Sequence, residues 1–223
     1  MRLLSTEYNF QIDLIENVIN VLVIESPTIL TNVLSDLWKQ YNNGDGQFVL
    51  LDKDKKIKFS NKIEYISNIF DLNINNKKIL NKLYSELNSI SNESCLLEKQ
   101  LLNIKTIEFL DKIINQTPYP LIYNADFNAL DIFKLYDVKL DTISTSLLES
   151  IVEYLSVINR ICNVNIFVFV GLKTLLNEQE LFELYKFVSY EKIHLILIEA
   201  FQNKLLENEK YLIIDQDACI IEL

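Results

Sequence analysis

Two carboxylates follow apolar runs and could hold a metal ion. Glu25 ends the run 18–24, and Glu199 ends the run 193–198. Such runs are typical of strands buried on both faces, and α/β proteins place ligands at the carboxyl edge of their sheet. Magnesium or calcium bound there would support an NTPase or nuclease. The alternative is that both are ordinary acids at solvated strand ends.

The loop that would bind a nucleotide is missing. A Gly-x-x-x-x-Gly-Lys-Ser/Thr loop surrounds phosphates with bare backbone N–H groups, and its lysine neutralises them. Here Ser26, Pro27 and Thr28 follow the first apolar run, with neither glycine nor lysine. Proline suits the first position of a helix capped by Ser26. The chain is therefore expected to keep an α/β frame without the usual NTPase chemistry.

Few side chains could act as nucleophiles, bases or soft metal ligands. His194 is the single histidine, so no Ser-His-Asp, Cys-His or two-histidine metal site can form. Inside a strand it is expected to be a hydrogen-bonded core or interface group. Cys95, Cys162 and Cys219 are odd in number and far apart, which excludes a disulfide framework. We expect reduced, mostly buried thiols.

A lysine cluster is the feature with most functional weight. Ten residues contain five lysines, which are Lys53, Lys55, Lys56, Lys58 and Lys62. Such a cluster could contact the phosphates of nucleic acid. Asp52 and Asp54 offset part of the charge, and a solvated hairpin gives the same pattern. DNA contact and simple solvation are both open at this point.

Composition limits the class of protein. The 223 residues, 49% of them hydrophobic, suit one unit of two subdomains. The net charge of −10 predicts repulsion from nucleic acid and anionic membranes unless basic residues gather on one face. The longest uncharged apolar stretch, 161–172, is shorter than the ~20 residues that a bilayer requires. Glu7 precedes any apolar signal region. We expect a cytoplasmic protein with no membrane partner.

An α/β sheet built from both ends of the chain must position these residues. Asn177 and Glu180 form an expected capping box for a helix ending at Ser189, between two apolar strands, which indicates a parallel crossover. An earlier helix is expected from Ser26 to a turn near Asn43. Strands are expected at residues 8–15, 18–24, 48–51, 165–170 and 193–198, with 211–214 and 218–222 as edge strands.

A helical insertion is expected between the two halves of the sheet. From 61 to about 115 apolar residues recur with a period of 3.6, which predicts a long arm whose stripe packs on another helix, within the chain or from a second subunit. Helices at 127–136 and 144–160 follow the break at Pro118 and Pro120. The predicted domains are therefore 1–60 with 160–223, and the insertion 61–159.

The order and spacing of these elements resemble the Csn family of CRISPR-associated adaptation proteins, the non-nuclease acquisition subunit of type II-A systems. The resemblance spans most of the chain and is weakest over residues 86–125. It is carried by the stretches 19–25 with the following helix, 69–74, 137–141, 166–170, 193–199 and 209–214.

The resemblance implies a degenerate NTPase-like α/β domain with a helical insertion. It implies a homotetrameric ring, not an enzyme, whose lysine-lined hole encloses double-stranded DNA that enters from its ends. The protein would act in antiviral defence, beside the CRISPR integrase and effector nuclease, when spacers are acquired. Four inward-facing lysine clusters would concentrate positive potential on phosphates while acids face outward, so contact would be independent of sequence.

The resemblance also implies calcium ions that brace the ring, held before the second insertion helix. This chain departs there, because residues 117–126 offer one carboxylate, Asp126, where several hard oxygen ligands are needed. Glu108, Asp111 and Asp131 are the candidates to complete such a site. The alternative for Asp126 is the N-cap of the helix expected at 127–136.

Two other functions are open. The protein could be a protein-only scaffold of the adaptation complex, with its helical arm binding other acquisition proteins. It could also be a metal-dependent NTPase or nuclease that uses Glu25 and Glu199, although the missing phosphate loop argues against this.

Overall fold

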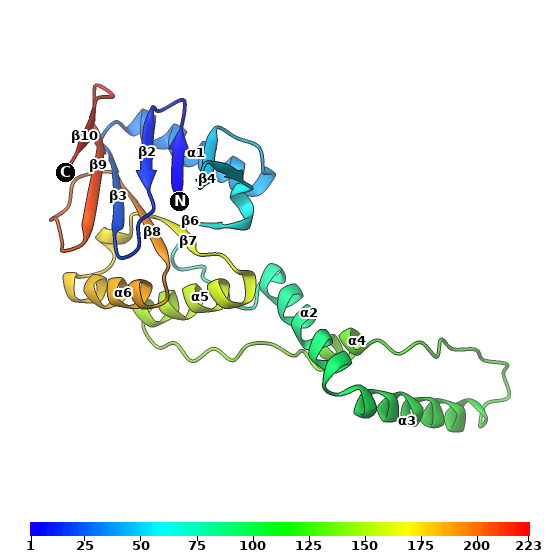
Figure 1. Cartoon of the computed structure of the whole chain (residues 1–223). Helices are drawn as coiled ribbons and strands as arrows, with labels where there is room; N and C mark the ends of the chain where they lie inside the picture. Colours follow the sequence, from blue (N-terminus) through cyan, green and yellow to red (C-terminus); the bar gives the residue numbers. More distant parts are fainter. The chain divides into compact units, whose positions relative to one another are not determined.

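The computed structural model describes all residues, 1–223 (Figure 1). Contacts divide the chain into two units, one formed by Met1–Ile74 and Ile143–Leu223 and the other by Asn75–Thr142. None of the helices combines the length and the apolar character that crossing a bilayer requires.

A six-stranded sheet forms the centre of the first unit. The strands in the order β9-β3-β8-β7-β6 run parallel, and β10 pairs with β9 in the antiparallel direction. The predicted mostly parallel α/β sheet is confirmed. The edge position predicted for residues 211–214 is wrong, because β10 covers the outer side of β9. The strands are β3 (Ile19–Ile24), β6 (Ile63–Ile66), β7 (Ile166–Val170), β8 (His194–Glu199), β9 (Glu209–Ile214) and β10 (Ile220–Glu222).

A second, antiparallel sheet of four strands has the order β2-β1-β4-β5. Its strands are β1 (Arg2–Ser5), β2 (Phe10–Asp13), β4 (Phe48–Asp52) and β5 (Lys55–Ile57). The prediction covered β2 and β4 but missed β1 and β5, which are only three or four residues long. Strands this short show few alternations of their own. β2 also has four residues, but buried and less buried positions continue to alternate on both sides of it, from 8 to 15.

The central sheet is covered on both faces, which explains why its strands are continuous apolar runs. Leu22, Val168 and Ile196 belong to a core cluster shared with the four-stranded sheet and with α1 (Pro27–Asn43). On the opposite side α6 (Glu178–Tyr190) contacts β8, and α5 (Leu147–Cys162) packs beside α6 (Figure 1). Burying each such aliphatic side chain contributes about 1.5–3 kcal/mol.

Local sequence fixes the ends of these helices. α1 begins with Pro27 and ends at Gly44, whose φ of 86° is the left-handed conformation that glycine adopts without strain. The capping box predicted at Asn177 and Glu180 is confirmed at the start of α6. A second capping box, Ser146 with Glu149, opens α5.

The second unit contains three helices, α2 (Lys77–Glu93), α3 (Leu96–Ile114) and α4 (Ala129–Leu135). The arm predicted from 61 to 115 is therefore wrong in two respects. Its first residues form β6, and the helical part is broken at Cys95, which has the non-helical angles φ −125° and ψ 31°. At the base of the unit, the Asn75 side chain donates to the Leu140 carbonyl at 3.0 Å and accepts from the Leu140 N–H at 2.9 Å.

The boundaries of the helical unit differ from those of the predicted insertion. β6 pairs with β7, and α5 packs beside α6, so both elements belong to the first unit, although all of β6 and most of α5 lie within residues 61–159. The difference arises because α5 has a helical period regardless of whether it packs on the sheet or on other helices.

Candidate nucleic-acid interface

The lysine cluster lies on a β-hairpin. Strands β4 and β5 are joined by Lys53 and Asp54, whose φ values of 46° and 64° are those of a two-residue type I′ turn. Asp52 pairs with Lys55 in the register of the two strands. The hairpin alternative of the sequence analysis thus describes the local structure, and we call residues 48–58 the basic hairpin.

Apolar residues anchor the basic hairpin to the core and leave its lysines outside. Ile57 packs against the core cluster. Phe59, directly after the hairpin, is buried with its ring centroid 6.4 Å from that of Phe48. The exposed side chains are the charged ones, the acidic Asp52 and Asp54 as well as Lys53, Lys55, Lys56 and Lys58.

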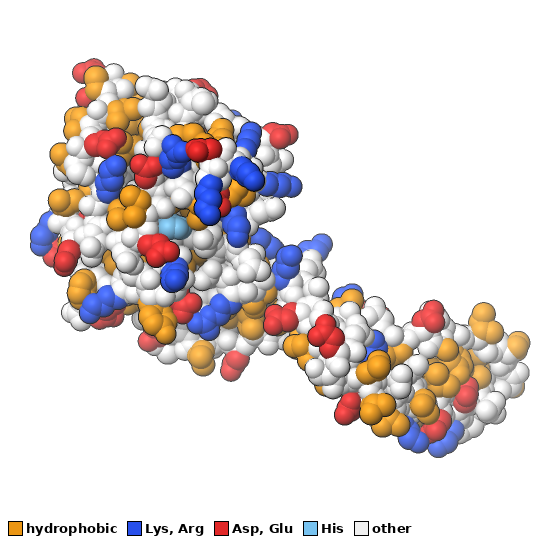
Figure 2. Space-filling view, in the orientation of Figure 1, with side chains coloured by type: hydrophobic (Ala, Val, Ile, Leu, Met, Phe, Trp, Pro, Cys, Tyr) orange, Lys and Arg blue, Asp and Glu red, His pale blue; other side chains and the backbone are white.

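The charges around the hairpin leave these ammonium groups available. Arg2 forms an ion pair with Asp54, so one of the two carboxylates of the hairpin is paired with a residue outside it. None of the five candidate lysines takes part in a salt bridge. Figure 2 shows Lys and Arg side chains gathered over β4 and β5. A local basic surface therefore exists on an acidic protein.

Lys62 differs from the other four. It is half-buried, and its Nζ donates to the backbone carbonyl of Asn163 at 3.2 Å. One of its N–H groups is thus used within the fold, so Lys62 has less freedom to reach a phosphate.

The structure does not assemble a metal site from Glu25 and Glu199. Glu25 is exposed, whereas Glu199 is 2% exposed and accepts a hydrogen bond from the Lys173 N–H at 2.9 Å. Burial raises the pKa of the Glu199 carboxyl, and the Lys173 N–H partly opposes that rise. The expectation of a solvated acid is therefore wrong for Glu199. No group of three or more His, Cys, Asp or Glu side chains in the chain could hold a metal ion.

A buried ion pair that the sequence analysis did not predict lies next to Glu199. The Lys173 Nζ lies 2.6 and 2.7 Å from the two carboxylate oxygens of Glu209 and 2.7 Å from the Tyr211 hydroxyl. Tyr185 donates its hydroxyl to Glu209 at 2.6 Å. Burial is the largest of the effects that raise the pKa of the Tyr185 and Tyr211 hydroxyls. Because every polar group is satisfied, the cluster has the properties of a structural ion pair.

Comparison with known proteins decides the family. The family of CRISPR-associated proteins described as Cas_Csn2 matches residues 40–218. The chain belongs to the Csn2 family. A relative from Streptococcus agalactiae, "CRISPR-associated protein Csn2", is 25% identical over 211 residues, which cover 90% of this chain and 92% of the relative. Among solved structures, a putative ABC transporter ATP-binding protein from Pyrococcus furiosus matches with a TM-score of 0.39 and 9% identity, over 91% of this chain and 88% of that one.

The single histidine of this Csn2-family protein is a core residue. His194 is buried, and it opens β8, whose six positions are all buried. Its Nδ1 has no hydrogen-bond partner. Burial lowers the pKa of the imidazole, which favours the neutral form. The expected core role is confirmed.

The cysteines are free, but the expectation that they are mostly buried is wrong. Cys95 and Cys219 are exposed, and Cys162 is half-buried. Cys95 lies at the break between α2 and α3, and Cys219 lies between β9 and β10, at positions that the hydrophobic pattern does not assign to a core.

Three of the four candidate calcium ligands of this Csn2-family chain have other side-chain partners. Glu108 forms an ion pair with Lys105 at 2.8 Å, which lowers the pKa of Glu108, and Asp111 accepts from the Tyr123 hydroxyl at 2.7 Å. Asp126 is not the N-cap of α4, because Asn128 occupies that position and accepts from the Leu130 N–H. Asp131 lies 3.7 Å from Lys134. These residues of a single chain do not fit a calcium site.

Proposed function

We propose that this protein binds double-stranded DNA without regard to sequence, without breaking a bond, and acts in CRISPR spacer acquisition as a homotetrameric ring threaded by DNA ends. The basic hairpin carries the proposal. It presents four exposed, unpaired lysines on a chain with a net charge of −10. A basic surface on an otherwise acidic protein is complementary in charge to a polyanion such as DNA.

The chemistry of the hairpin suits phosphate contact. Lysine ammonium groups on flexible stems neutralise phosphates as point charges and carry no information about base sequence. If all four lysines of one copy contact phosphates, that copy adds about −3.6 to the slope of log K against log salt, at about −0.9 for each phosphate neutralised. Binding should therefore weaken steeply as salt rises.

The helical unit supports assembly of several copies. Helix α3 has no buried residue, and Leu97, Leu101 and Phe109 are 71%, 61% and 62% exposed. A helix with such a stripe requires a partner to bury it. A second copy of this chain supplies that partner in the proposed ring.

The residues at the carboxyl ends of β3 and β8 favour a binding role over a catalytic one. Ser26, Pro27 and Thr28 replace the phosphate loop after β3, and Glu199 is held by the Lys173 N–H instead of facing Glu25 as a ligand pair. Magnesium-dependent nucleotide turnover that disappears in Glu25→Gln or Glu199→Gln would contradict this assignment.

The test compares binding to linear and covalently closed circular duplexes of one sequence across a salt series, measured by band shift. Threading predicts retention on linear DNA and little on circles. Equal binding to both forms would indicate contact with an open surface, and the ring mechanism would be rejected.

Lysine variants locate the contact. We expect Lys55→Glu with Lys56→Glu to weaken DNA binding at least about tenfold, because two phosphate contacts in each copy become repulsive. The control is Lys39→Glu with Lys186→Glu, which makes the same charge change on exposed residues of α1 and α6. Unchanged binding in the hairpin variant would support a protein-only scaffold instead, whose exposed α3 would bind other acquisition proteins.

Assembly and calcium are tested separately. The integrase and effector nuclease of the same system are the proposed protein partners, and a tetramer in light scattering is the expected size. A monomer at micromolar concentration, with and without calcium, would remove the ring. Because one chain brings together no group of three or more His, Cys, Asp or Glu side chains that could hold a metal ion, calcium would need oxygen ligands from more than one copy.

A further inference from the structure

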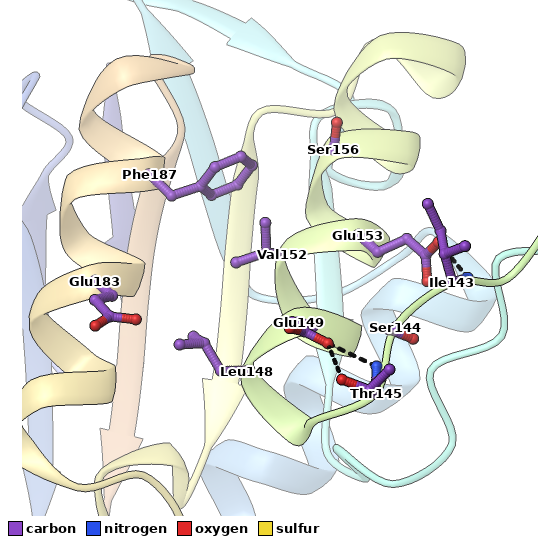
Figure 3. Close-up of a pocket in the computed structure, with 10 residues that line it drawn as sticks. All are labelled: Ile143, Ser144, Thr145, Leu148, Glu149, Val152, Glu153, Ser156, Glu183 and Phe187. Carbon is purple, nitrogen blue, oxygen red and sulfur yellow. Dashed lines mark hydrogen bonds between the residues drawn. The ribbon is translucent and has the colours of Figure 1, made fainter.

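An open groove lies between helices α5 and α6, and the DNA-binding proposal does not use it. Its volume is about 590 Å³, and Figure 3 shows its lining. One wall comes from the segment before α5, the floor and rim from α5 and α6. The groove lies wholly within the first unit.

The floor of the groove is apolar. Leu148 and Val152 lie four residues apart on α5, so they share one helix face, and Phe187 faces them from α6 (Figure 3). All three side chains are half-buried, which leaves apolar surface for an occupant to cover.

The rim of the groove is acidic. Glu149, Glu153 and Glu183 line it, and an adjoining hollow of about 410 Å³ adds Glu180. No lysine or arginine lines either hollow, and none of the four glutamates forms a salt bridge.

The glutamates of the rim differ in how far their carboxylates are already hydrogen-bonded. Glu149 and Glu180 are held by their capping boxes, with Glu149 accepting from the Thr145 N–H at 2.6 Å. Glu153 accepts only a long bond, 3.4 Å from the Ile143 N–H, and Glu183 accepts only from Gln179 at 3.3 Å. Glu153 and Glu183 are therefore the two carboxylates with most capacity for a new cation.

We propose that this groove binds a cationic amphipathic helix of another protein. Leu148 and Val152 of α5, together with Phe187 of α6, form the kind of apolar groove in which an amphipathic helix places its own apolar side chains. Lysines or arginines on the flanks of that helix would meet Glu153 and Glu183. Charge complementarity of this kind sets partner choice and the rate of association.

A second copy of this chain fits the groove poorly. The unpartnered helix α3 carries three lysines and three acids, so it brings no net positive charge. The chain as a whole is also acidic, with a net charge of −10. DNA is repelled by the same rim. A basic protein segment is the occupant that the charges favour.

The experiment uses the full-length protein and a fluorescent synthetic helix of about 18 residues made of leucine and lysine, with leucine at helical spacing. Fluorescence anisotropy is expected to show micromolar binding. A peptide with glutamate in place of lysine, and one with the same leucine and lysine content in scrambled order, should not bind. Hydrogen exchange should slow at residues 147–156 and 180–187 when the leucine-lysine peptide is added.

Charge variants make the test specific. Glu153→Lys with Glu183→Lys is expected to weaken peptide binding about tenfold, whereas Glu207→Lys with Asp217→Lys makes the same charge change on exposed residues outside the groove and should leave it unchanged. Both variants change surface residues, and thermal melting checks that they fold.

Three results would overturn the proposal. The first is equal weakening in both variants, which would mean attraction to the overall charge only. The second is no binding of the leucine-lysine peptide, or exchange protection elsewhere in the chain. The third is a smaller particle in light scattering for Glu153→Lys with Glu183→Lys and no peptide present, which would make a second copy the occupant.

Discussion

Replacing Lys173 by methionine should destabilise the first unit strongly. The Lys173 and Glu209 side chains are 2% and 0% exposed, so the charge that remains on Glu209 cannot be solvated. Glu209 would keep only the Tyr185 hydroxyl and the Leu206 N–H as donors. Breaking one side of such a buried pair costs about 3–5 kcal/mol, which is a large part of the about 5–15 kcal/mol that stabilises a typical domain.

The assay is urea unfolding at one fixed protein concentration, because assembly would otherwise change the apparent stability. The double variant Lys173→Met with Glu209→Gln removes both charges and should recover at least about 1 kcal/mol of the loss. A loss below about 1 kcal/mol for Lys173→Met, or a double variant as unstable as the sum of its single changes, would refute the view that an uncompensated buried charge dominates here.

Three further perturbations have defined outcomes. Burial lowers the pKa of the His194 imidazole below 6.5, so the unfolded state binds the proton more tightly than the folded state. The free energy of unfolding should therefore fall as the pH drops below 6.5. Thermal melting measures this fall, and the variant His194→Gln should lose it. Ser146→Ala should cost about 1 kcal/mol in urea unfolding because it removes the capping box of α5, whereas Ser85→Ala, in the middle of α2, should change little. Leu101→Asp with Phe109→Asp on exposed α3 should reduce particle size in light scattering and leave circular dichroism unchanged; an unchanged size would argue against assembly through α3.

Long, regular patterns in the sequence predicted the central sheet well. β3 and β8 are six-residue runs buried at every position, and that pattern is distinctive. β5 contains three residues, two of them exposed lysines, and therefore has no hydrophobic signal. β6 has a buried Glu64, whose charge masks the strand pattern, and Glu64 accepts from Tyr154 ninety residues away in the chain. Interactions at this sequence distance decide whether a polar residue is buried.

The candidate sites also divide into those built from residues close in sequence, which could be predicted, and those built from distant residues, which could not. The basic hairpin was predictable because its turn, its anchoring apolar residues and its lysines are all local in sequence. The Lys173–Glu209 pair was not, because its members are 36 residues apart and neither lies in a recognisable motif. The acidic groove was missed because it depends on the packing of α5 beside α6, and periodicity gives the faces of helices but not their neighbours.

The paired hydrogen bonds between Asn75 and Leu140 bear on how the chain folds. β6 and β7 are neighbours in the sheet, yet about a hundred residues separate them along the chain, and closing so long a flexible loop carries an entropic penalty that grows with its length. A helical unit whose two ends are fastened at Asn75 and Leu140 shortens the effective connection to the residues before Asn75 and after Leu140, which number roughly 35. By the logarithmic dependence on loop length, a reduction from about 100 residues to about 35 spares the pairing of β6 with β7 about 1 kcal/mol. The asparagine clamp therefore lowers the entropic penalty of a large insertion between adjacent strands.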